Sequence, residues 1–297
     1  MVLAVFNQHY RPFDPIFDRV PKMTVEQLLE LPELDAVVID CDENIQTEYA
    51  LMAAERGLAI QMEKPGSESD VDFDRLIDLV QEKGLVFHVS YMYRYNPAIM
   101  YAMEKIQSGA IGDVYCVEAQ MNIYHGKLLR NRYGEFSGGV MYYLGCHMTD
   151  LIYRIQGEPL DITTFNADLG EEGVDSRDFG LAVLRYPHGA SIAKVSAGEI
   201  GGAPYRRCVI ICGTKGTLEI RPIEYPVGNG LDRTEIKETY LGDGAIKHTT
   251  FAPYGRYTRM LSEFAAMVCG EKENPYSYEY ERALHKLILK TCDYQNL

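Results

Sequence analysis

The chain has 297 residues, 46% hydrophobic and 24% charged, which is an ordinary composition for a globular protein, and its length favours two domains. Acidic residues outnumber basic ones by 43 to 29 without a dense Lys or Arg run, which argues against nucleic acid or a membrane surface as partner. No apolar run could cross a membrane, and no signal pattern begins the chain. The seven cysteines lack paired spacing, so we expect a cytoplasmic protein without a metal site.

Residues 1–97 alternate predicted strands and helices. The strands are expected at 2–6, 35–39, 58–62 and 85–90, and the helices at 24–31, 45–56 and 69–83. This rhythm is typical of a parallel sheet with right-handed crossovers. Ligands of such sheets bind beyond the carboxyl ends of the strands. We therefore expect the site in the segments that follow strands, which are 7–9, 40–44, 63–65 and 91–96.

From residue 98 the pattern changes to long alternating runs and tight turns, which indicate an antiparallel sheet. Strands are expected at 114–124, 177–186, 190–197, 206–212 and 217–220, and helices at 96–108, 137–157, 257–268 and 278–292. Residues 221–250 have no clear pattern. Too few helices follow the strands to cover both faces of the sheet, so we expect one face to be buried in a homodimer or homotetramer.

The segment 137–157 is predicted to be a helix that follows a glycine turn and is capped by Ser137. Tyr143, His147 and Asp150 have the spacing i, i+4 and i+7, which places a phenol, an imidazole and a carboxylate on one face. Gly145 is unfavourable inside a helix, so we expect another group to approach the backbone there. On spacing alone, a buried core histidine explains this pattern somewhat better than a catalytic one.

Five short motifs occur in order along the chain. They are Glu63-Lys64-Pro65 (E-K-P), Arg94-Tyr95-Asn96-Pro97 (R-x-N-P), residues 109–114 (G-x-[IL]-G-x-V), residues 145–150 (G-x-H-x-x-D) and residues 213–217 (G-T-x-G-[ST]). Together they resemble the Gfo/Idh/MocA family of oxidoreductases, whose members act on sugars and cyclitols with NAD(P). Each motif alone is weak, but five at the expected separations are specific. The resemblance covers nearly the whole chain and implies a Rossmann domain followed by an α+β domain.

The resemblance implies hydride transfer between nicotinamide and a hydroxyl carbon of a sugar, glycoside or cyclitol. Such a transfer needs a base for the hydroxyl proton and a positive charge near the developing oxyanion. His147 suits the first role and Lys64 the second, and Tyr143 and Asp150 support them. Asp150 could equally orient a neighbour. The side chains expected to bind substrate are Tyr124, His125, Lys127 and His147, although an exposed loop explains His125 and Lys127 equally well.

The resemblance also implies a set of cofactor-binding side chains. They are Asn7, Cys41, Asp42, Glu43, Asn44, Gln46, Glu63, Lys64 and Arg94. Arg94 could instead pin the junction between the domains. The acidic pair Asp42 and Glu43 would repel a phosphate, so NAD is expected rather than NADP. The peptide between Lys64 and Pro65 is expected to be cis, as in the family.

Three departures from the family pattern bear on function. The glycine fingerprint G-x-G-x-x-G is absent because the chain begins at what resembles the second strand, so the phosphate anchor is missing. Tyr143 stands four residues before His147, where relatives often carry Asp. The family's T-P-x-x-x-H is replaced by residues 41–46.

The expected fold class is therefore α/β plus α+β. An incomplete Rossmann domain spans residues 1–97, and an open, mostly antiparallel domain spans residues 98–297. If residues 1–297 are the whole protein, we expect weak nicotinamide binding. Two further functions stay open: a non-catalytic, truncated or regulatory sugar-binding relative, and NAD-dependent glycoside cleavage through transient oxidation.

Overall fold

The computed structural model describes residues 20–293, so the predicted strand at 2–6 and Asn7 lie outside the described residues. The chain divides into two compact units, residues 1–90 with 263–278 and residues 91–262 with 279–297. The first boundary between the units lies between residues 90 and 91, a few residues before the boundary expected near 97. Residues 263–278 belong with the first unit, whereas the sequence-based division placed them in the second domain.

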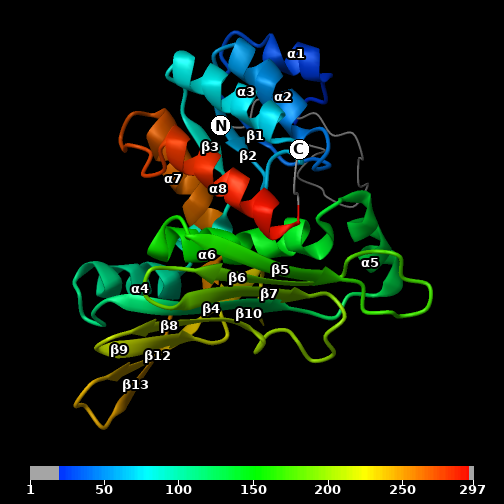
Figure 1. Ribbon diagram of the computed structural model, residues 1–297. Helices are drawn as coiled ribbons and strands as arrows, with labels where there is room; N and C mark the ends of the chain where they lie inside the picture. The colour runs from blue at the N-terminus through cyan, green and yellow to red at the C-terminus, as the bar shows by residue number, and fades with distance from the viewer. Residues whose placement is uncertain (1–19, 294–297) are drawn as a thin grey trace. The chain divides into compact units, whose positions relative to one another are not determined.

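The first unit is built on a parallel three-stranded sheet. Its strands pair in sequence order as β1 (Ala36–Ile39), β2 (Ala59–Met62) and β3 (Phe87–Val89), and its helices are α1 (Val25–Leu29), α2 (Gln46–Glu55) and α3 (Asp70–Glu82) (Figure 1). Side chains start two of the helices, since Thr24 forms a capping box with Gln27 and the Ser69 hydroxyl accepts from the Asp72 amide. The predicted parallel α/β rhythm is confirmed.

Residues 263–278 join the first unit through the edge strand β3. The side chains of Asn274 and Tyr278 donate to the backbone oxygens of Phe87 and Leu85 over 2.7 and 2.6 Å. Two residues apart on a strand, these carbonyls point the same way, away from β2. The segment thus satisfies a sheet edge that would otherwise be unpaired. Such side-chain contacts between distant segments leave no periodic signal in the sequence.

The second unit is built on an eight-stranded sheet of order β13-β12-β9-β8-β4-β7-β6-β5, in which only β4 and β7 pair in parallel. Its strands are β4 (Val114–Asn122), β5 (Asp161–Ala167), β6 (Phe179–Arg185), β7 (Ala190–Ser196), β8 (Arg207–Gly213), β9 (Gly216–Ile220), β12 (Glu235–Tyr240) and β13 (Ile246–Thr250). The mostly antiparallel sheet is as predicted. The sequence patterns missed the edge strand β5, which alternates exposed and half-buried residues.

Residues 221–250, which had no clear pattern, contain four strands. Two of them, β12 and β13, extend the large sheet. The other two belong to a small sheet of order β10 (Tyr225–Gly228), β11 (Leu231–Arg233) and β14 (Tyr254–Gly255), in which β11 is the central strand. The remaining helices are α4 (Pro97–Gln107), α5 (Lys127–Arg132), α6 (Cys146–Gln156), α7 (Thr258–Val268) and α8 (Tyr278–Thr291). Among the described residues, no helix is long and apolar enough to span a membrane.

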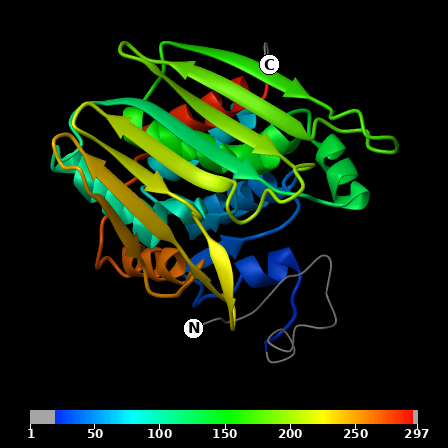
Figure 2. The same ribbon diagram turned by 90° about the horizontal axis from the view of Figure 1, so that it is seen from below.

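One face of the large sheet is covered and the other is open. Helix α6 packs on β4 and β7 (Figure 1), whereas the strands of the opposite face lie in front in Figure 2, with no helix of the described second unit over them. The open face carries a cross-strand row of half-buried side chains, Val183, Ile192, Glu118 and Ile210, and the exposed ring of Phe165. An apolar row on an uncovered face is unusual in a monomer.

The helix predicted over 137–157 is not a single α-helix. A π-helical turn, Met141–Gly145, precedes α6, and Val140, not Ser137, stands at its N-terminal cap position. The Val140 amide donates to the backbone oxygen of Arg177 over 2.8 Å, so a neighbouring segment starts this helix. A π-helical turn contains more residues than an α-helical turn. Tyr143 lies within this turn, so the i, i+4 spacing does not place it on the same helix face as His147 in the way predicted.

The close approach expected at Gly145 is confirmed, and the groups are Met141 and Val195. A Cβ on Gly145 would lie 2.2 Å from the Met141 sulfur and 3.3 Å from Val195 Cγ1. A Cβ on Gly180 of β6 would lie 3.0 Å from the same methionine. The Met141 side chain therefore fills the space between two glycines, which lets the helical segment lie directly on the sheet.

Candidate functional site

The carboxyl ends of β1 and β2 carry most of the predicted cofactor-binding side chains. Residues 41–44 follow β1 and Glu63 and Lys64 follow β2. The Glu63 amide donates to the backbone oxygen of Ile39 over 2.8 Å, so the two segments leave the sheet at the same edge. This edge is where a parallel sheet binds its ligands.

Gln46 supports the loop that follows Lys64. Its buried amide donates to the backbone oxygen of Gly66 over 2.8 Å, just after the Lys64–Pro65 peptide, which is cis as the family resemblance implied. Lys64 itself is only 7% exposed. Gln46 was predicted to contact cofactor, and the structure places its amide nitrogen on the loop that presents Lys64.

The edge of the first unit is electrostatically negative. Burial, with Asp40 and Glu43 nearby, raises the pKa of Glu63 to about 7, although Lys64 opposes this shift. Burial raises the pKa of the Cys41 thiol to about 12, and the carboxylates of Asp40, Asp42 and Glu43 add to the effect. A thiol with so high a pKa is not a nucleophile at neutral pH.

His147 lies on α6 between two tyrosines. The short 3-10 helix Met92–Tyr95 and the residue before it bring Tyr91 and Tyr93 against the imidazole, with ring centroids 6.0 and 5.2 Å away in edge-to-face arrangements. His147 is 4% exposed. Burial raises the pKa of both phenols well above the usual value, so both stay protonated.

Asp150, one turn after His147, belongs to a buried ion cluster. Arg94 lies 2.7 Å from Asp150 Oδ1 through Nη2 and 2.5 Å from Glu281 Oε1 through Nη1, and it stacks over the Tyr91 ring at 4.6 Å. Arg94, Asp150 and Glu281 are at most 2% exposed. Burial raises the pKa of both carboxyl groups even though Arg94 opposes the shift. The structure thus connects Arg94 and Asp150, two predicted site residues, with Glu281 of α8.

Tyr143 and His125 meet around a third aromatic residue. The Tyr143 ring lies 5.2 Å from the ring of Tyr133, and Tyr133 Oη is 2.5 Å from His125 Nδ1. Tyr124, which precedes His125 at the end of β4, is 51% exposed. The sequence pattern found Tyr124, His125 and Tyr143 but not Tyr133, which begins the short 3-10 helix Tyr133–Glu135 and belongs to no motif.

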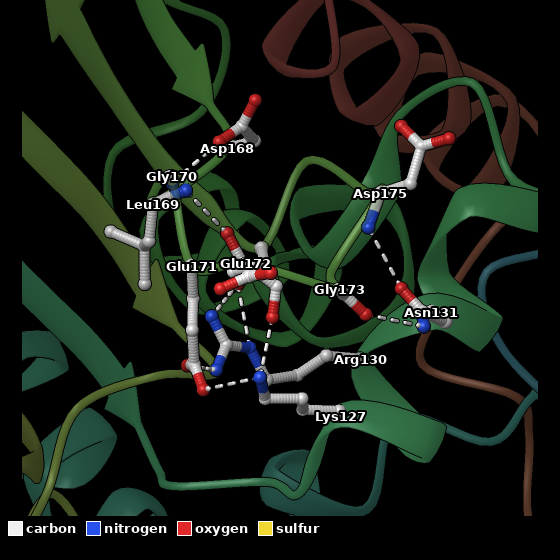
Figure 3. A network of polar contacts seen from close by, with 11 residues as sticks. Lys127, Arg130, Asn131, Asp168, Leu169, Gly170, Glu171, Glu172, Gly173 and Asp175 are labelled. Carbon is white, nitrogen blue, oxygen red and sulfur yellow. Dashed lines mark hydrogen bonds and ion pairs between the residues drawn. The ribbon is translucent and has the colours of Figure 1, made fainter.

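Lys127 and Arg130 hold α5 against the loop between β5 and β6 (Figure 3). Lys127 Nζ donates to the backbone oxygen of Glu172 and lies 3.5 Å from Glu171 Oε1. Arg130 is buried, pairs with Glu171, and donates through Nε to Asp178 Oδ2 over 2.6 Å. The ammonium of Lys127, predicted to bind substrate, is therefore engaged with a loop of its own unit.

Besides Tyr133, sequence reasoning missed four side chains of this region. Tyr91 and Tyr93 lie in the segment 91–96, which was singled out as a strand end, so a signal for them existed. Glu281 and Arg207 had none, because each reaches the site from a distant segment. Arg207 donates to Glu224 Oε1 over 2.6 Å, and its charge influences the pKa of Tyr93 and His125. Within residues 20–293, no cluster of His, Cys, Asp and Glu could hold a metal ion.

Comparison with known proteins identifies both halves of the chain. Residues 8–91 match "Oxidoreductase family, NAD-binding Rossmann fold" and residues 99–219 match "GFO/IDH/MocA C-terminal domain". D-xylose 1-dehydrogenase (NADP(+)) 2 of Haloferax volcanii is 28% identical over 246 residues, which cover 82% of this chain and 72% of that protein. Trans-1,2-dihydrobenzene-1,2-diol dehydrogenase of Xenopus tropicalis is 24% identical over 204 residues, 68% of this chain and 60% of that protein.

A solved structure shows the same fold. UDP-N-acetylglucosamine 3-dehydrogenase from Acidithiobacillus ferrooxidans superposes with a TM-score of 0.76 at 19% identity, covering 98% of this chain and 88% of that one. The two matched ranges together account for most of the sequence, and they agree with the parallel and antiparallel sheets described above. The chain therefore belongs to the Gfo/Idh/MocA family of oxidoreductases.

Proposed function

We propose that the protein is a dehydrogenase that transfers hydride between NAD and a hydroxyl carbon of a sugar, glycoside or cyclitol. The observation that carries the proposal is the placement of His147 within the family motif, buried between two tyrosines and one turn before a charged cluster. The names of two relatives, a xylose dehydrogenase and a dihydrodiol dehydrogenase, support a polyhydroxylated or diol substrate.

When bound, the nicotinamide ring would exchange hydride with the carbon that bears the reacting hydroxyl. His147 would take the hydroxyl proton during oxidation and return it during reduction, because a neutral imidazole titrates near neutral pH. Lys64 would stabilise the negative charge that develops on the oxygen. Tyr91 and Tyr93 hold the imidazole from two sides, and Asp150 acts on the site through Arg94 as a positioning residue.

The carboxyl edge of the first unit fits a dinucleotide without a ribose phosphate better than one that carries it. Asp40, Asp42 and Glu43 surround Cys41 closely enough to raise its pKa, and a phosphate placed there would be repelled. Carboxylates can accept hydrogen bonds from ribose hydroxyls instead. NAD is therefore proposed as the cofactor, even though the name of the Haloferax relative specifies NADP.

The test is a panel of aldoses, glycosides and cyclitols assayed with NAD and with NADP for the appearance of reduced nicotinamide. We expect turnover of at least one substrate, faster with NAD, and its loss in Lys64→Met. If calorimetry detects sugar binding but no substrate turns over, the protein is instead a non-catalytic sugar-binding relative. Release of an aglycone without net reduction of NAD would favour glycoside cleavage through transient oxidation.

We also propose that the open sheet face pairs with a second copy of the chain. Val183, Ile192 and Ile210 form a half-buried apolar row on that face, beside the exposed Phe165. A homodimer would remove this row from water. Light scattering at micromolar concentration should give a dimer or tetramer, and Ile192→Asp should shift it toward the monomer. A wild-type monomer would overturn this proposal.

A further inference from the structure

The side chains of His125 and Tyr133, on either side of α5 (Lys127–Arg132), form a hydrogen-bonded pair. Tyr133 Oη lies 2.5 Å from His125 Nδ1. Tyr133 is fully buried and His125 is half-buried. Burial and the neighbouring Tyr143 raise the pKa of Tyr133 well above the usual value, so the phenol keeps its proton.

The direction of this hydrogen bond follows from the surroundings of each partner. Within the described chain, the Tyr133 hydroxyl has no polar partner other than His125. If His125 Nδ1 carried the proton and donated, the buried phenol would have no acceptor for its own hydrogen, which costs about 1–3 kcal/mol. If the phenol donates to Nδ1, both groups are satisfied. The second arrangement places the imidazole proton on Nε2.

His125 also stays neutral in this pair. Burial lowers its pKa, and the positive charge of Arg207 lowers it further. The Tyr133 ring contacts that of Tyr143, which lies four residues before the candidate catalytic residue His147.

We infer that Tyr133 holds His125 as the neutral tautomer whose Nε2–H donates a hydrogen bond to an acceptor oxygen of the substrate. This rests on the proposed function: it gives His125, already expected to bind substrate, a defined hydrogen-bonding role and adds Tyr133 as the residue that positions it. His125 is half-buried, and its only side-chain hydrogen bond among the described residues is the one from Nδ1 to Tyr133. A donor in a partly buried site selects a substrate with a hydroxyl or carbonyl oxygen at that position over its deoxy analogue.

The tautomer is measured directly by nitrogen NMR of the protein labelled with ¹⁵N-histidine. The His125 signals are assigned by their absence in His125→Gln. We expect Nδ1 of wild-type His125 to be unprotonated at neutral pH and Nε2 to be protonated, and Tyr133→Phe to give a mixture of tautomers. Protonated Nδ1 in the wild type would overturn the inference. This arm needs no turnover, so it remains decisive if the proposed dehydrogenase activity is absent.

The recognition step is measured with the sugar that turns over fastest in the substrate panel. Loss of one hydrogen bond contributes about 0.5–1.5 kcal/mol, so Tyr133→Phe should raise KM roughly 2- to 10-fold with little change in kcat. His125→Leu should raise KM at least as much, whereas His125→Gln, which keeps an N–H near the Nε2 position, should largely restore it. Equal KM values for wild type and His125→Leu would overturn the recognition role.

Tyr186→Phe is the matched control for the loss of a buried phenol. Its hydroxyl donates to the backbone oxygen of Gly157 over 3.1 Å in the same unit, away from His125. It should lower the melting temperature about as much as Tyr133→Phe while leaving KM and the His125 tautomer unchanged. If KM rises as much in Tyr186→Phe as in Tyr133→Phe, the effect comes from a general loss of stability of the second unit. That result would overturn the inference.

Discussion

His147→Asn is expected to lower turnover of the best substrate by about 10²- to 10⁴-fold, the usual contribution of a general acid–base residue. Asparagine keeps a polar side chain in the space between Tyr91 and Tyr93 but cannot take or return a proton near neutral pH. The free energy of unfolding should fall far less than the barrier rises, by about 1 kcal/mol for the lost edge-to-face packing with two rings, because asparagine keeps a polar side chain in the same space. Steady-state rates and denaturant melts of the same preparations measure both effects.

Substitutions at two other histidines are the controls that distinguish a catalytic effect from an effect on packing. His285 is buried on α8, so His285→Asn should cost stability without a comparable loss of turnover. His188 is exposed in the turn between β6 and β7, and His188→Asn should change neither. A deuterated substrate shows whether hydride transfer limits the rate. If it does, and if His147→Asn matches the wild type across neutral pH, His147 is not the base.

The sequence predicted the parallel sheet and most strands of the large sheet because these elements leave periodic signals, whereas the four strands within residues 221–250 do not. β2 and β3 are short buried strands with one polar residue each among apolar ones, and β6 and β7 alternate around a four-residue turn, so their type could be predicted from the local pattern. The edge strand β5 carries threonines, an aspartate and an asparagine among its apolar residues, which gave no such signal. The π-turn Met141–Gly145 was also unpredictable, because it depends on a methionine that fits between glycines of two elements.

The site was predictable only where a motif coincided with a strand end or a helix. His147, Asp150 and Arg94 all lie in motifs, and the structure adds that Asp150 and Arg94 contact each other. What motifs could not show is the partner of this pair, since Glu281 is 187 residues from Arg94 along the chain. The Tyr133–His125 contact was missed for a different reason. Its partners are eight residues apart on either side of the short helix α5, and no motif or shared helix face relates them in the sequence.

The largest loss of stability is expected for Arg94→Met. Arg94 is the cation between Asp150 and Glu281, and all three side chains are almost fully buried. Removing one partner of a buried ion pair typically costs about 3–5 kcal/mol, because the remaining charge is left in a medium that solvates it poorly. Here one substitution leaves two carboxylates without a counter-charge. We therefore expect the free energy of unfolding to fall by an amount at the upper end of that range, measured by denaturant unfolding.

The loss should depend on pH in a defined direction. Burial already raises the pKa of Asp150 and Glu281 in the folded protein, and removal of Arg94 takes away the charge that opposes the shift. The folded variant therefore holds protons that the unfolded chain has released, so its stability falls as pH rises above the ordinary carboxyl range. Asp150 Oδ2 is buried without a hydrogen-bond donor among the described residues, so a proton placed there breaks no existing bond.

Neutral substitutions at the carboxylates distinguish charge from volume. Glu281→Gln leaves one carboxylate with one guanidinium, so it should cost less than Arg94→Met and flatten the decline of stability with pH. In the triple variant Arg94→Met, Asp150→Asn, Glu281→Gln no buried charge is left unpaired, and it should recover much of the stability lost in Arg94→Met. If the triple variant is no more stable than Arg94→Met at mildly alkaline pH, the loss comes from the packing of Arg94 on the Tyr91 and Tyr280 rings. In that case the cation–π contacts, and not the ion cluster, hold the segment that carries Tyr91 and Tyr93 against α6.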